Sequence, residues 1–254
     1  MTEVAIVANA FGTQAVRLRG HDAWLDLAAR SGATGFEVRR ELFSHEADAS
    51  PEALRTLGAA IAAHGLWAVY STPCELYGDG GVLDADALSE AHAQADALGA
   101  RWLKLQLGSF RGQAHADAIA GVTAGRRARL VIENGQSERS GAIAQFVDLF
   151  AALEREGTPR LLGMTFDIGN WAWAGQAPLD AARALASHVE YVHCKSSQGE
   201  GARRFPMAPA IDDPVFAAVF GMLPRTAPRA IEFPLDPGRP AGDAQNWVAW
   251  LAAA

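Results

Sequence analysis

Cysteine is scarce in this chain, which has two cysteines among its 254 residues. Cys74 and Cys194 lie far apart in the sequence and form no CxxC pair. A disulfide framework and a thiolate metal site of the usual spacing are therefore excluded. Two isolated thiols are typical of a protein in a reducing compartment, so we predict a cytoplasmic location.

Long hydrophobic runs and an excess of positive charge are also missing. No stretch approaches the ~20 apolar residues that a membrane-spanning helix needs. The first residues include Glu3 and lack the basic start and long apolar core of a signal peptide. Lysine and arginine number 22 against 29 acidic residues, which gives a net charge of −7. These absences argue against a membrane or a nucleic acid as the main partner.

What the chain does contain is a regular alternation of short apolar runs and helical segments, and 50% of its residues are hydrophobic. About eight strand–helix pairs follow one another without a break in composition, so we predict an α/β fold, a (β/α)8 TIM barrel that forms a single domain over residues 1–254. A doubly wound open sheet is the alternative, although the first strand lacks the GxGxxG turn common in such sheets. The expected strands span residues 4–9, 35–38, 66–70, 102–107, 130–133, 163–167, 189–193 and 229–232, and the expected helices span residues 20–29, 51–64, 84–98, 113–126, 141–156, 179–187, 213–222 and 243–252.

Four consecutive late strands are expected to end in an ionisable residue: Glu133, Asp167, His193 and Glu232. Successive members lie about one strand–helix unit of roughly 30 residues apart. In a barrel, all four side chains would then point at one spot on the C-terminal face. A lone ionisable group at the end of a buried strand is costly unless it is paired. The alternative is four unrelated polar residues at loop starts.

Three converging carboxylates cannot all stay ionised without a cation or the uptake of a proton. Two carboxylates ~4 Å apart repel each other by about 4 kcal/mol at an effective dielectric constant of ~20. Carboxylate oxygens combined with one imidazole suit Mn²⁺, Mg²⁺, Zn²⁺ or Co²⁺. We therefore predict one divalent metal ion, whose identity the sequence leaves open, on Glu133, Asp167, His193 and Glu232.

The order Glu, Asp, His, Glu at the ends of these strands resembles the xylose-isomerase-like TIM-barrel superfamily, which includes sugar and sugar-phosphate isomerases and epimerases, dehydratases and type IV endonucleases. The likeness spans nearly the whole chain and implies that the four residues are metal ligands and that Glu133 and Glu232 double as acid–base groups. Where ketose epimerases usually carry a histidine three residues after the aspartate, this chain has Asn170. The segment after Glu133 shows no clear match to the epimerases' substrate carboxylate, and the early strand ends lack the extra histidines of the endonucleases.

Five further residues at or beside the strand ends are candidates for substrate binding. Lys195 follows His193 by two residues and can share its side of the strand, where it would hold a substrate oxygen or simply pair with a carboxylate. Glu37 would bind a hydroxyl or pair with a neighbouring arginine, and Trp171 would wall the pocket or pack within its loop. The five candidates are Glu37, Lys104, Asn170, Trp171 and Lys195.

These residues favour a sugar isomerase or epimerase that depends on a divalent metal. Such an enzyme moves a proton next to the carbonyl of a small polyhydroxy substrate. A dehydratase of a cyclic keto-polyol on the same site is an alternative, and a non-catalytic barrel that binds a sugar or metabolite is another. The expected partner is a carbohydrate-like small molecule, and the oligomeric state stays open, a homodimer included.

Overall fold

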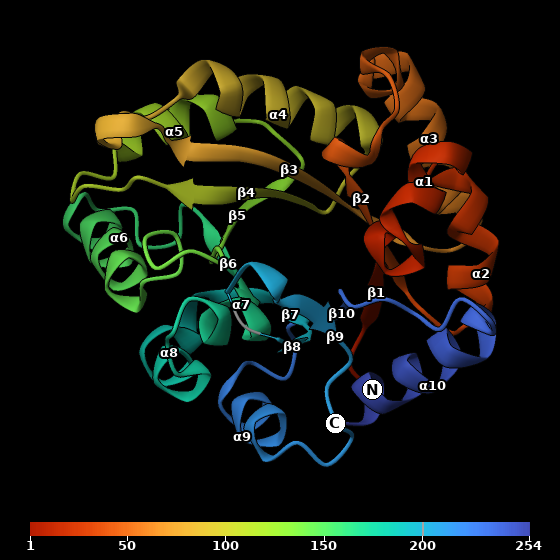
Figure 1. Cartoon of the computed structure of the whole chain (residues 1–254). Coiled ribbons are helices and arrows are strands. Elements are labelled where there is room, and N and C mark those ends of the chain that lie inside the picture. Colours follow the sequence, from red (N-terminus) through yellow and green to blue (C-terminus); the bar gives the residue numbers. More distant parts are fainter. Residues whose placement is uncertain (200) are drawn as a thin grey trace.

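Eight parallel strands close into a barrel in the computed structural model, which describes residues 1–199 and 201–254 (Figure 1). Each barrel strand pairs with its neighbours in sequence, and β1 closes the barrel by pairing with both β2 and β10. The predicted (β/α)8 barrel is confirmed, and the open sheet is wrong because no strand of the barrel has a free edge within the described residues. The barrel strands are β1 (Val4–Val7), β2 (Gly35–Arg39), β3 (Trp67–Tyr77), β4 (Trp102–Gly108), β5 (Arg129–Glu133), β6 (Gly163–Asp167), β7 (Val189–Cys194) and β10 (Arg229–Ile231).

Helices surround the barrel and cover its outer face (Figure 1). Their apolar sides pack on outward-facing strand residues such as Ile6, Phe36 and Ile132, which belong to the main hydrophobic core. Among the described helices, none combines the length and apolar character needed to cross a bilayer. The helices are α1 (Thr13–Arg19), α2 (Leu25–Arg30), α3 (Pro51–Ala63), α4 (Ala85–Leu98), α5 (Ala116–Thr123), α6 (Ile143–Arg155), α7 (Ile168–Trp173), α8 (Pro178–Leu185), α9 (Pro214–Met222) and α10 (Pro240–Ala253).

The inside of the barrel is filled by a smaller apolar layer that includes Val69, Trp102, Val131 and Tyr191. Successive strand residues alternate between the inside and the outside, so the residues two positions further along point inward one layer higher. At the bottom of this layer, a Cβ on Gly35 would lie 2.5 Å from the ring of Trp67. Glycine is therefore needed where the indole crosses the barrel floor.

Three features of the fold were not expected from the sequence. Helix α1 follows Gly12 directly and buries only Val16, so its apolar signal is weak. Helix α7 follows β6 directly, in a stretch where no helix was predicted. A short antiparallel pair, β8 (Ser196–Gln198) and β9 (Phe205–Met207), lies outside the barrel in the connection after β7. None of the three changes the order of the barrel strands.

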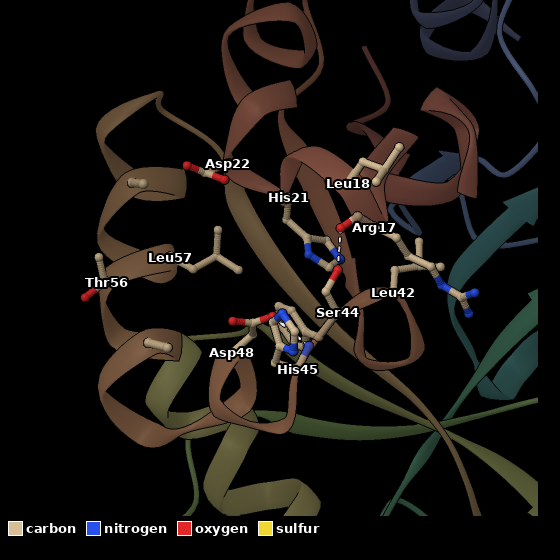
Figure 2. A pocket seen from close by; sticks show the side chains of 14 residues that line it. Arg17, Leu18, His21, Asp22, Leu42, Ser44, His45, Asp48, Thr56 and Leu57 are labelled. Atoms are coloured by element: carbon tan, nitrogen blue, oxygen red, sulfur yellow. Dashed lines mark hydrogen bonds between the residues drawn. The ribbon is translucent and has the colours of Figure 1, made fainter. Parts of the chain in front are cut away.

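A cavity of about 560 Å³ opens on the flank of the barrel between α1, α3 and residues 42–48 (Figure 2). His21 lies in its wall and is 3% exposed, and its Nε2 accepts a hydrogen bond from the backbone N–H of Arg39 at 3.3 Å. Burial lowers the pKa of His21 to about 4, although Asp22 and Asp48 nearby favour its charged form. The folded state therefore holds this ring neutral.

Replacing His21 by glutamine is expected to flatten the acid side of the stability curve. The pKa of histidine in the unfolded chain is near 6.5, so between pH 6.5 and about 4 the unfolded state binds the extra proton and stability falls as the pH is lowered. The wild type should lose about 3 kcal/mol more than the variant across this window. Chemical denaturation at a series of pH values measures the difference.

The matched control is His64→Gln, on the exposed C-cap of α3. Arg17 and His45, which also line the cavity, are unchanged in both variants. The His64 variant should follow the wild-type curve. If both variants lose the same stability as the wild type on acidification, His21 does not control the transition.

Candidate metal centre

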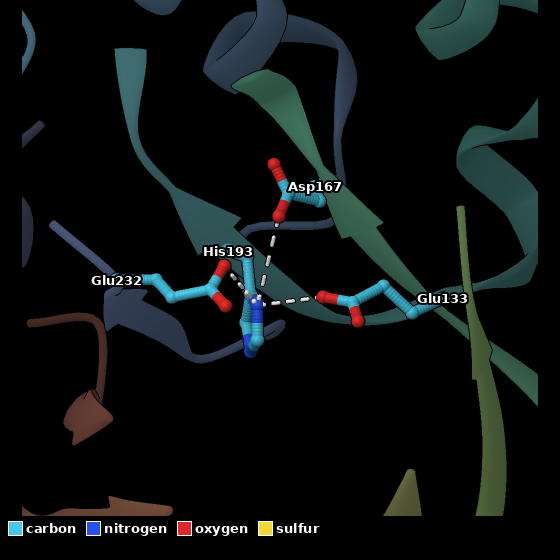
Figure 3. A group of neighbouring side chains, drawn as sticks. All are labelled: Glu133, Asp167, His193 and Glu232. Atoms are coloured by element: carbon cyan, nitrogen blue, oxygen red, sulfur yellow. Dashed lines mark hydrogen bonds and ion pairs between the residues drawn. The ribbon is translucent and has the colours of Figure 1, made fainter. Parts of the chain in front are cut away.

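Glu133, Asp167, His193 and Glu232 converge at the C-terminal mouth of the barrel (Figure 3). One oxygen or nitrogen from each side chain lies within 4.8 Å of those from the other three. Glu133 and Asp167 are the last residues of β5 and β6, His193 is in β7, and Glu232 directly follows β10. All four are almost completely buried. The predicted convergence of the four strand ends is thus present.

The barrel pleat places these groups on one level. Val131, Thr165, Tyr191 and Ala230 stand two residues before the four site residues and are themselves completely buried. Because strand residues two apart share a face, the four ionisable groups point inward one layer above them. The apolar layer below shields the site from water and strengthens its electrostatic interactions.

His193 is oriented by Glu37 from the neighbouring side of the barrel. Nε2 of His193 lies 2.8 Å from Oε2 of Glu37, which can only accept a hydrogen bond while ionised. The Nε2 hydrogen is therefore committed to Glu37, and Nδ1 faces the other carboxylates. Nδ1 donates to them when the ring is protonated, and a metal ion would displace this hydrogen. A carboxylate behind a histidine in this way fixes the tautomer that a metal ligand needs.

Three carboxylate oxygens crowd the single Nδ1 of His193 (Figure 3). Oε1 of Glu133 and Oε2 of Glu232 are each 2.8 Å away, and Oδ2 of Asp167 is 3.8 Å away. One Nδ1 hydrogen could satisfy only one of them, and Oε1 of Glu133 accepts no hydrogen bond of good geometry from residues 1–199 and 201–254. Burial opposes the charge of His193, but Glu37 and Glu232 raise its pKa well above the ordinary value. The donor set fits a divalent ion, which would satisfy all three oxygens together.

Lys104 supports the site from below. Its Nζ lies 2.6 Å from Oε2 of Glu133 and 3.4 Å from Oε1 of Glu37. Nε2 of Gln106 donates to the same Glu133 oxygen at 2.8 Å. Burial alone would raise the pKa of Glu133, but Lys104 and His193 lower it, so this carboxylate is ionised. Its second oxygen stays directed at the metal position.

Lys195 and Arg39 bind the carboxylates on the side of the site opposite Lys104. Nζ of Lys195 bridges Oδ2 of Asp167 at 2.6 Å and Oε2 of Glu232 at 2.7 Å. Nη1 of Arg39 donates to the other oxygen of Glu232 at 2.7 Å, while its Nη2 pairs with Glu41 at 2.6 Å. Burial disfavours the charge of Lys195, but Asp167 and Glu232 raise its pKa above the ordinary value. Arg39 was considered from the sequence only as a partner of Glu37.

The charges of this cluster balance only with a further cation or with added protons. When His193 is neutral, as a metal ligand must be, three cationic side chains face five carboxylates, and the deficit of two charges equals the charge of one divalent ion. Without the ion, the raised pKa values of His193 and Asp167 offset part of this deficit. Buried carboxylates in excess of their partners are strongly unfavourable. The cations are Arg39, Lys104 and Lys195, and the carboxylates are Glu37, Glu41, Glu133, Asp167 and Glu232.

A cavity of about 310 Å³ lies over the centre at the barrel mouth. Glu133, Glu232, Asn170 and Lys195 line it, together with Arg39. Of the candidates for substrate binding, Asn170 and Lys195 are therefore placed where a ligand would lie.

The substrate-binding role predicted for Glu37 and Lys104 is corrected because both side chains lie too deep in the barrel. Glu37 is completely buried and Lys104 is 1% exposed, and neither lines the mouth cavity. Both lie one layer too low to touch a substrate there. They instead orient His193 and Glu133, which is a positioning role.

The predicted role of Trp171 in the wall of the pocket is also corrected. It is completely buried and packs against Phe146 and Phe166, with ring centroids 5.5 and 5.7 Å apart. The cause is α7, whose first turn rotates Trp171 toward the hydrophobic core and leaves Asn170 facing the mouth. Plain packing, the alternative reading of this tryptophan, is what the structure shows.

Asn134, which was not predicted as a site residue, connects the ends of β5 and β6. The side chain of Asn134 accepts from the backbone N–H of Asp167 at 2.9 Å and donates to its carbonyl at 3.0 Å. Oδ1 of Asp167 then accepts from the backbone N–H of Asn170 at 2.9 Å and so caps α7. Nδ2 of Asn170 returns a hydrogen bond to the Asn134 carbonyl at 2.7 Å. These bonds fix Asp167 with Oδ2 facing the metal position.

Changing Glu37 to glutamine is expected to weaken metal binding by about tenfold to a hundredfold. The amide would accept the Nε2 hydrogen less strongly, or donate to Nε2 and put the hydrogen on Nδ1 of His193, where it blocks the metal position. Competition with a chromophoric chelator for Mn²⁺ or Zn²⁺ gives the dissociation constant. Glu154→Gln, on the exposed side of α6, is the control and should bind as the wild type does. Equal affinity in all three proteins would mean that Glu37 does not orient His193.

Comparison with known proteins identifies solved structures that share the fold of this chain. No protein-family model matches the chain, and neither does any curated protein. D-allulose 3-epimerase from Methylomonas sp., solved in complex with D-allulose, is 16% identical with a TM-score of 0.64, over 98% of this chain and 97% of that chain. The probable 3-DHS dehydratase AsbF from Bacillus anthracis is 11% identical with a TM-score of 0.65, over 97% of both chains.

Endonuclease IV from Thermus thermophilus is similar over 99% of this chain and 100% of that chain, at 22% identity and a TM-score of 0.62. At these identities the likeness shows the fold alone. That fold is the one found in xylose isomerase domain proteins, so the structural resemblance expected from the four strand ends is confirmed.

Proposed function

We propose that this chain is an enzyme that depends on a divalent metal and moves a proton at the carbon next to the carbonyl of a small polyhydroxy substrate. The observation that carries the proposal is the placement of Glu133 and Glu232. Each has an oxygen 2.8 Å from Nδ1 of His193, and both line the same mouth cavity. Two carboxylates on either side of one ligand position can remove a proton and return it.

The bound metal would polarise the substrate carbonyl and an adjacent hydroxyl, which acidifies the carbon between them. Glu133 or Glu232 would take the proton from that carbon. Lys195, with an ammonium group held by Asp167 and Glu232, would donate a hydrogen bond to a substrate oxygen as negative charge develops on it. Asn170 would orient a hydroxyl group but could not exchange a proton near neutral pH.

Isomerisation and epimerisation are the reactions we favour. Return of the proton to the other face of the same carbon gives an epimer, and return to the neighbouring carbon gives an isomer. Structural neighbours support a carbohydrate-like substrate, because one of them binds D-allulose. A cytoplasmic location and action on a small molecule complete the proposal.

Dehydration of a cyclic keto-polyol is the second candidate, favoured by Lys195. Its ammonium group lines the mouth cavity and could protonate a departing hydroxyl group. One of the structural neighbours is a probable dehydratase. The second proton transfer would then go to the departing oxygen instead of to a carbon, and water would be lost.

Turnover across a substrate panel tests the proposal. Protein loaded with Mn²⁺, Mg²⁺, Zn²⁺ or Co²⁺ would be mixed with ketoses, hydroxy-ketones and cyclic keto-polyols, and products identified by NMR. New ketose or aldose signals support isomerisation or epimerisation, and an unsaturated product supports dehydration. Binding of a sugar without any product would overturn the enzyme proposal and support a non-catalytic binding protein. Asn170, in place of a histidine, is the feature that favours this alternative.

A further inference from the structure

A cavity of about 500 Å³ lies between α9 and α10, at the end of the barrel opposite the metal centre. Arg229, where β10 begins, Arg225 in the loop before that strand and Phe220 on α9 are in its wall, together with Thr2, which precedes β1. Parallel barrel strands all begin at the same end, so these residues are remote from Glu232 at the other end of β10. We call this space the α9–α10 cavity.

Arg229 is an almost buried cation in the wall of the α9–α10 cavity, with 5% of its surface exposed. Its Nη1 donates to the carbonyl of Leu251 at 2.6 Å, and its guanidinium lies 3.9 Å from the ring centre of Phe220. Leu251 is near the end of α10, where helix carbonyls lack partners, so this bond offsets only part of the charge. No carboxylate in the described part of the chain forms an ion pair with Arg229, and a buried charge without a partner is unfavourable.

The guanidinium of Arg229 has one edge without a partner. Nη1 is engaged with Leu251, whereas Nε and Nη2, which lie side by side on the other edge, donate to no acceptor within residues 1–199 and 201–254. Neither of these two atoms is fully enclosed by protein, so both can be reached from the cavity. Their hydrogens point in parallel and match two oxygens of a carboxylate or of a phosphate.

Positive charge dominates this wall, although the whole chain has a net charge of −7. Arg225 and Arg229 line the cavity, and no aspartate or glutamate of the described residues does. Burial, and to a smaller extent the charge of Arg225, lower the pKa of Arg229. Ala254 is also in the wall, but within the described structure its carboxylate pairs with neither arginine. An oxyanion between the two arginines would offset their repulsion and bind the open edge of Arg229.

We propose that the α9–α10 cavity binds a small organic anion through one carboxylate or phosphate group, held by the Nε and Nη2 edge of Arg229 and by Arg225. Phe220 and small apolar side chains such as Ala217 and Ala252 form much of the remaining wall, which suits a flat or apolar ligand body. The volume of about 500 Å³ is within the range of cavities that bind small molecules. This is a second site, separate from the metal centre and from its substrate.

Calorimetric titration of metal-loaded protein with three small probes tests the site. Benzoate and phenyl phosphate carry the two kinds of anionic group, and benzamide is the neutral counterpart of benzoate. The wild type should bind one of the anions at least about tenfold more tightly than benzamide, because hydrogen bonds to charged groups are strong. Whichever anion binds more tightly identifies the group that the arginines recognise.

Two substitutions in the cavity wall test the role of the arginines. Arg229→Lys keeps a positive charge and a donor for Leu251 but has no flat edge with two donors, so anion affinity should fall about tenfold or more. Arg225→Gln removes the exposed charge and should weaken binding about two- to fivefold, and it tests the site even if the buried substitution unfolds the protein. Arg160→Gln, an exposed arginine before β6 on the same face, is the matched control and should bind as the wild type does.

The outcomes decide the proposal without reference to turnover. Equal affinity for benzamide and the anions, or anion binding that is unchanged in both arginine variants, would overturn the site. Failure of the wild type to bind either anion would overturn it as well, and would mean that Ala254 or water satisfies the arginines. Removal of the metal with a chelator should leave anion binding unchanged. Loss of binding with the metal would place the anion on the metal centre and refute the α9–α10 site, whereas the roles proposed for Glu133 and Glu232 keep their own test.

Discussion

Asp167→Asn is expected to release the divalent ion and to lower turnover by at least about a hundredfold, since a catalytic metal contributes several kcal/mol to the transition state. Oδ2 of Asp167 is one of the four converging ligand atoms and lies 2.6 Å from Lys195. The amide has a single oxygen. If this oxygen stays on the backbone N–H of Asn170 and preserves the cap of α7, the NH2 group takes the metal position and cannot bind the ion. Metal content per chain, measured after purification from metal-rich medium, is the direct readout.

Asp167→Ala separates binding from folding. It loses the ligand and the helix cap together, so it should also lose about 1 kcal/mol of stability. Asp148→Ala, on the exposed face of α6, should keep both metal and stability. An asparagine variant that retains a full equivalent of metal, or wild-type protein without any, would refute the metal centre.

The ionisable residues of the site were predictable because each of them lies at the end of a buried strand. Glu133 and Asp167 each close an apolar run, where an ionisable group is too costly to bury alone. Four consecutive barrel strands, β5, β6, β7 and β10, then contribute one such residue each at a similar height. The same reasoning gave the barrel itself, since the strands and helices alternate along the whole chain.

Depth within the barrel was not predictable from the sequence. Lys104 pairs in register with Val131, one layer below Glu133, whereas Gln106 pairs with Glu133 itself. The register between neighbouring strands decides which of the two reaches the cavity, and no local pattern encodes that register. Glu37 was misplaced for the same reason: its strand ends two residues later, at Arg39, which faces inward one layer higher and reaches Glu232.

Helix α7 was missed because one residue has two roles. Asp167 ends β6 and also caps the helix that follows at once, so no loop separates the two elements. Gly169 and Asn170 then resemble a turn in the sequence. The glycine is required by packing, since a Cβ there would lie 2.7 Å from the backbone oxygen of Lys195. Once α7 is helical, Trp171 turns to the core.

Glu133→Gln and Glu232→Gln are each expected to slow proton exchange at the carbon next to the substrate carbonyl by about 10²–10⁴-fold. One oxygen of Glu133 is held by Lys104 and Gln106, and one oxygen of Glu232 is held by Arg39. Both carboxylates are thereby fixed in place, which positions them for proton transfer. Glutamine keeps an oxygen for the metal but cannot accept the proton, so each variant should retain the ion while exchange is lost. Glu154→Gln should exchange at the wild-type rate.

Solvent deuterium decides whether this pair of glutamates moves the proton. Metal-loaded enzyme and a substrate of the panel are incubated in D₂O, and NMR follows the signal at the carbon next to the carbonyl. The wild type should incorporate deuterium there as product forms. If only one variant loses exchange, that glutamate is the base and the other only a ligand. If product forms without deuterium in the wild type, hydrogen passes between carbons without reaching a carboxylate that exchanges with water. The roles assigned to Glu133 and Glu232 would then be wrong, although both would remain in the metal centre.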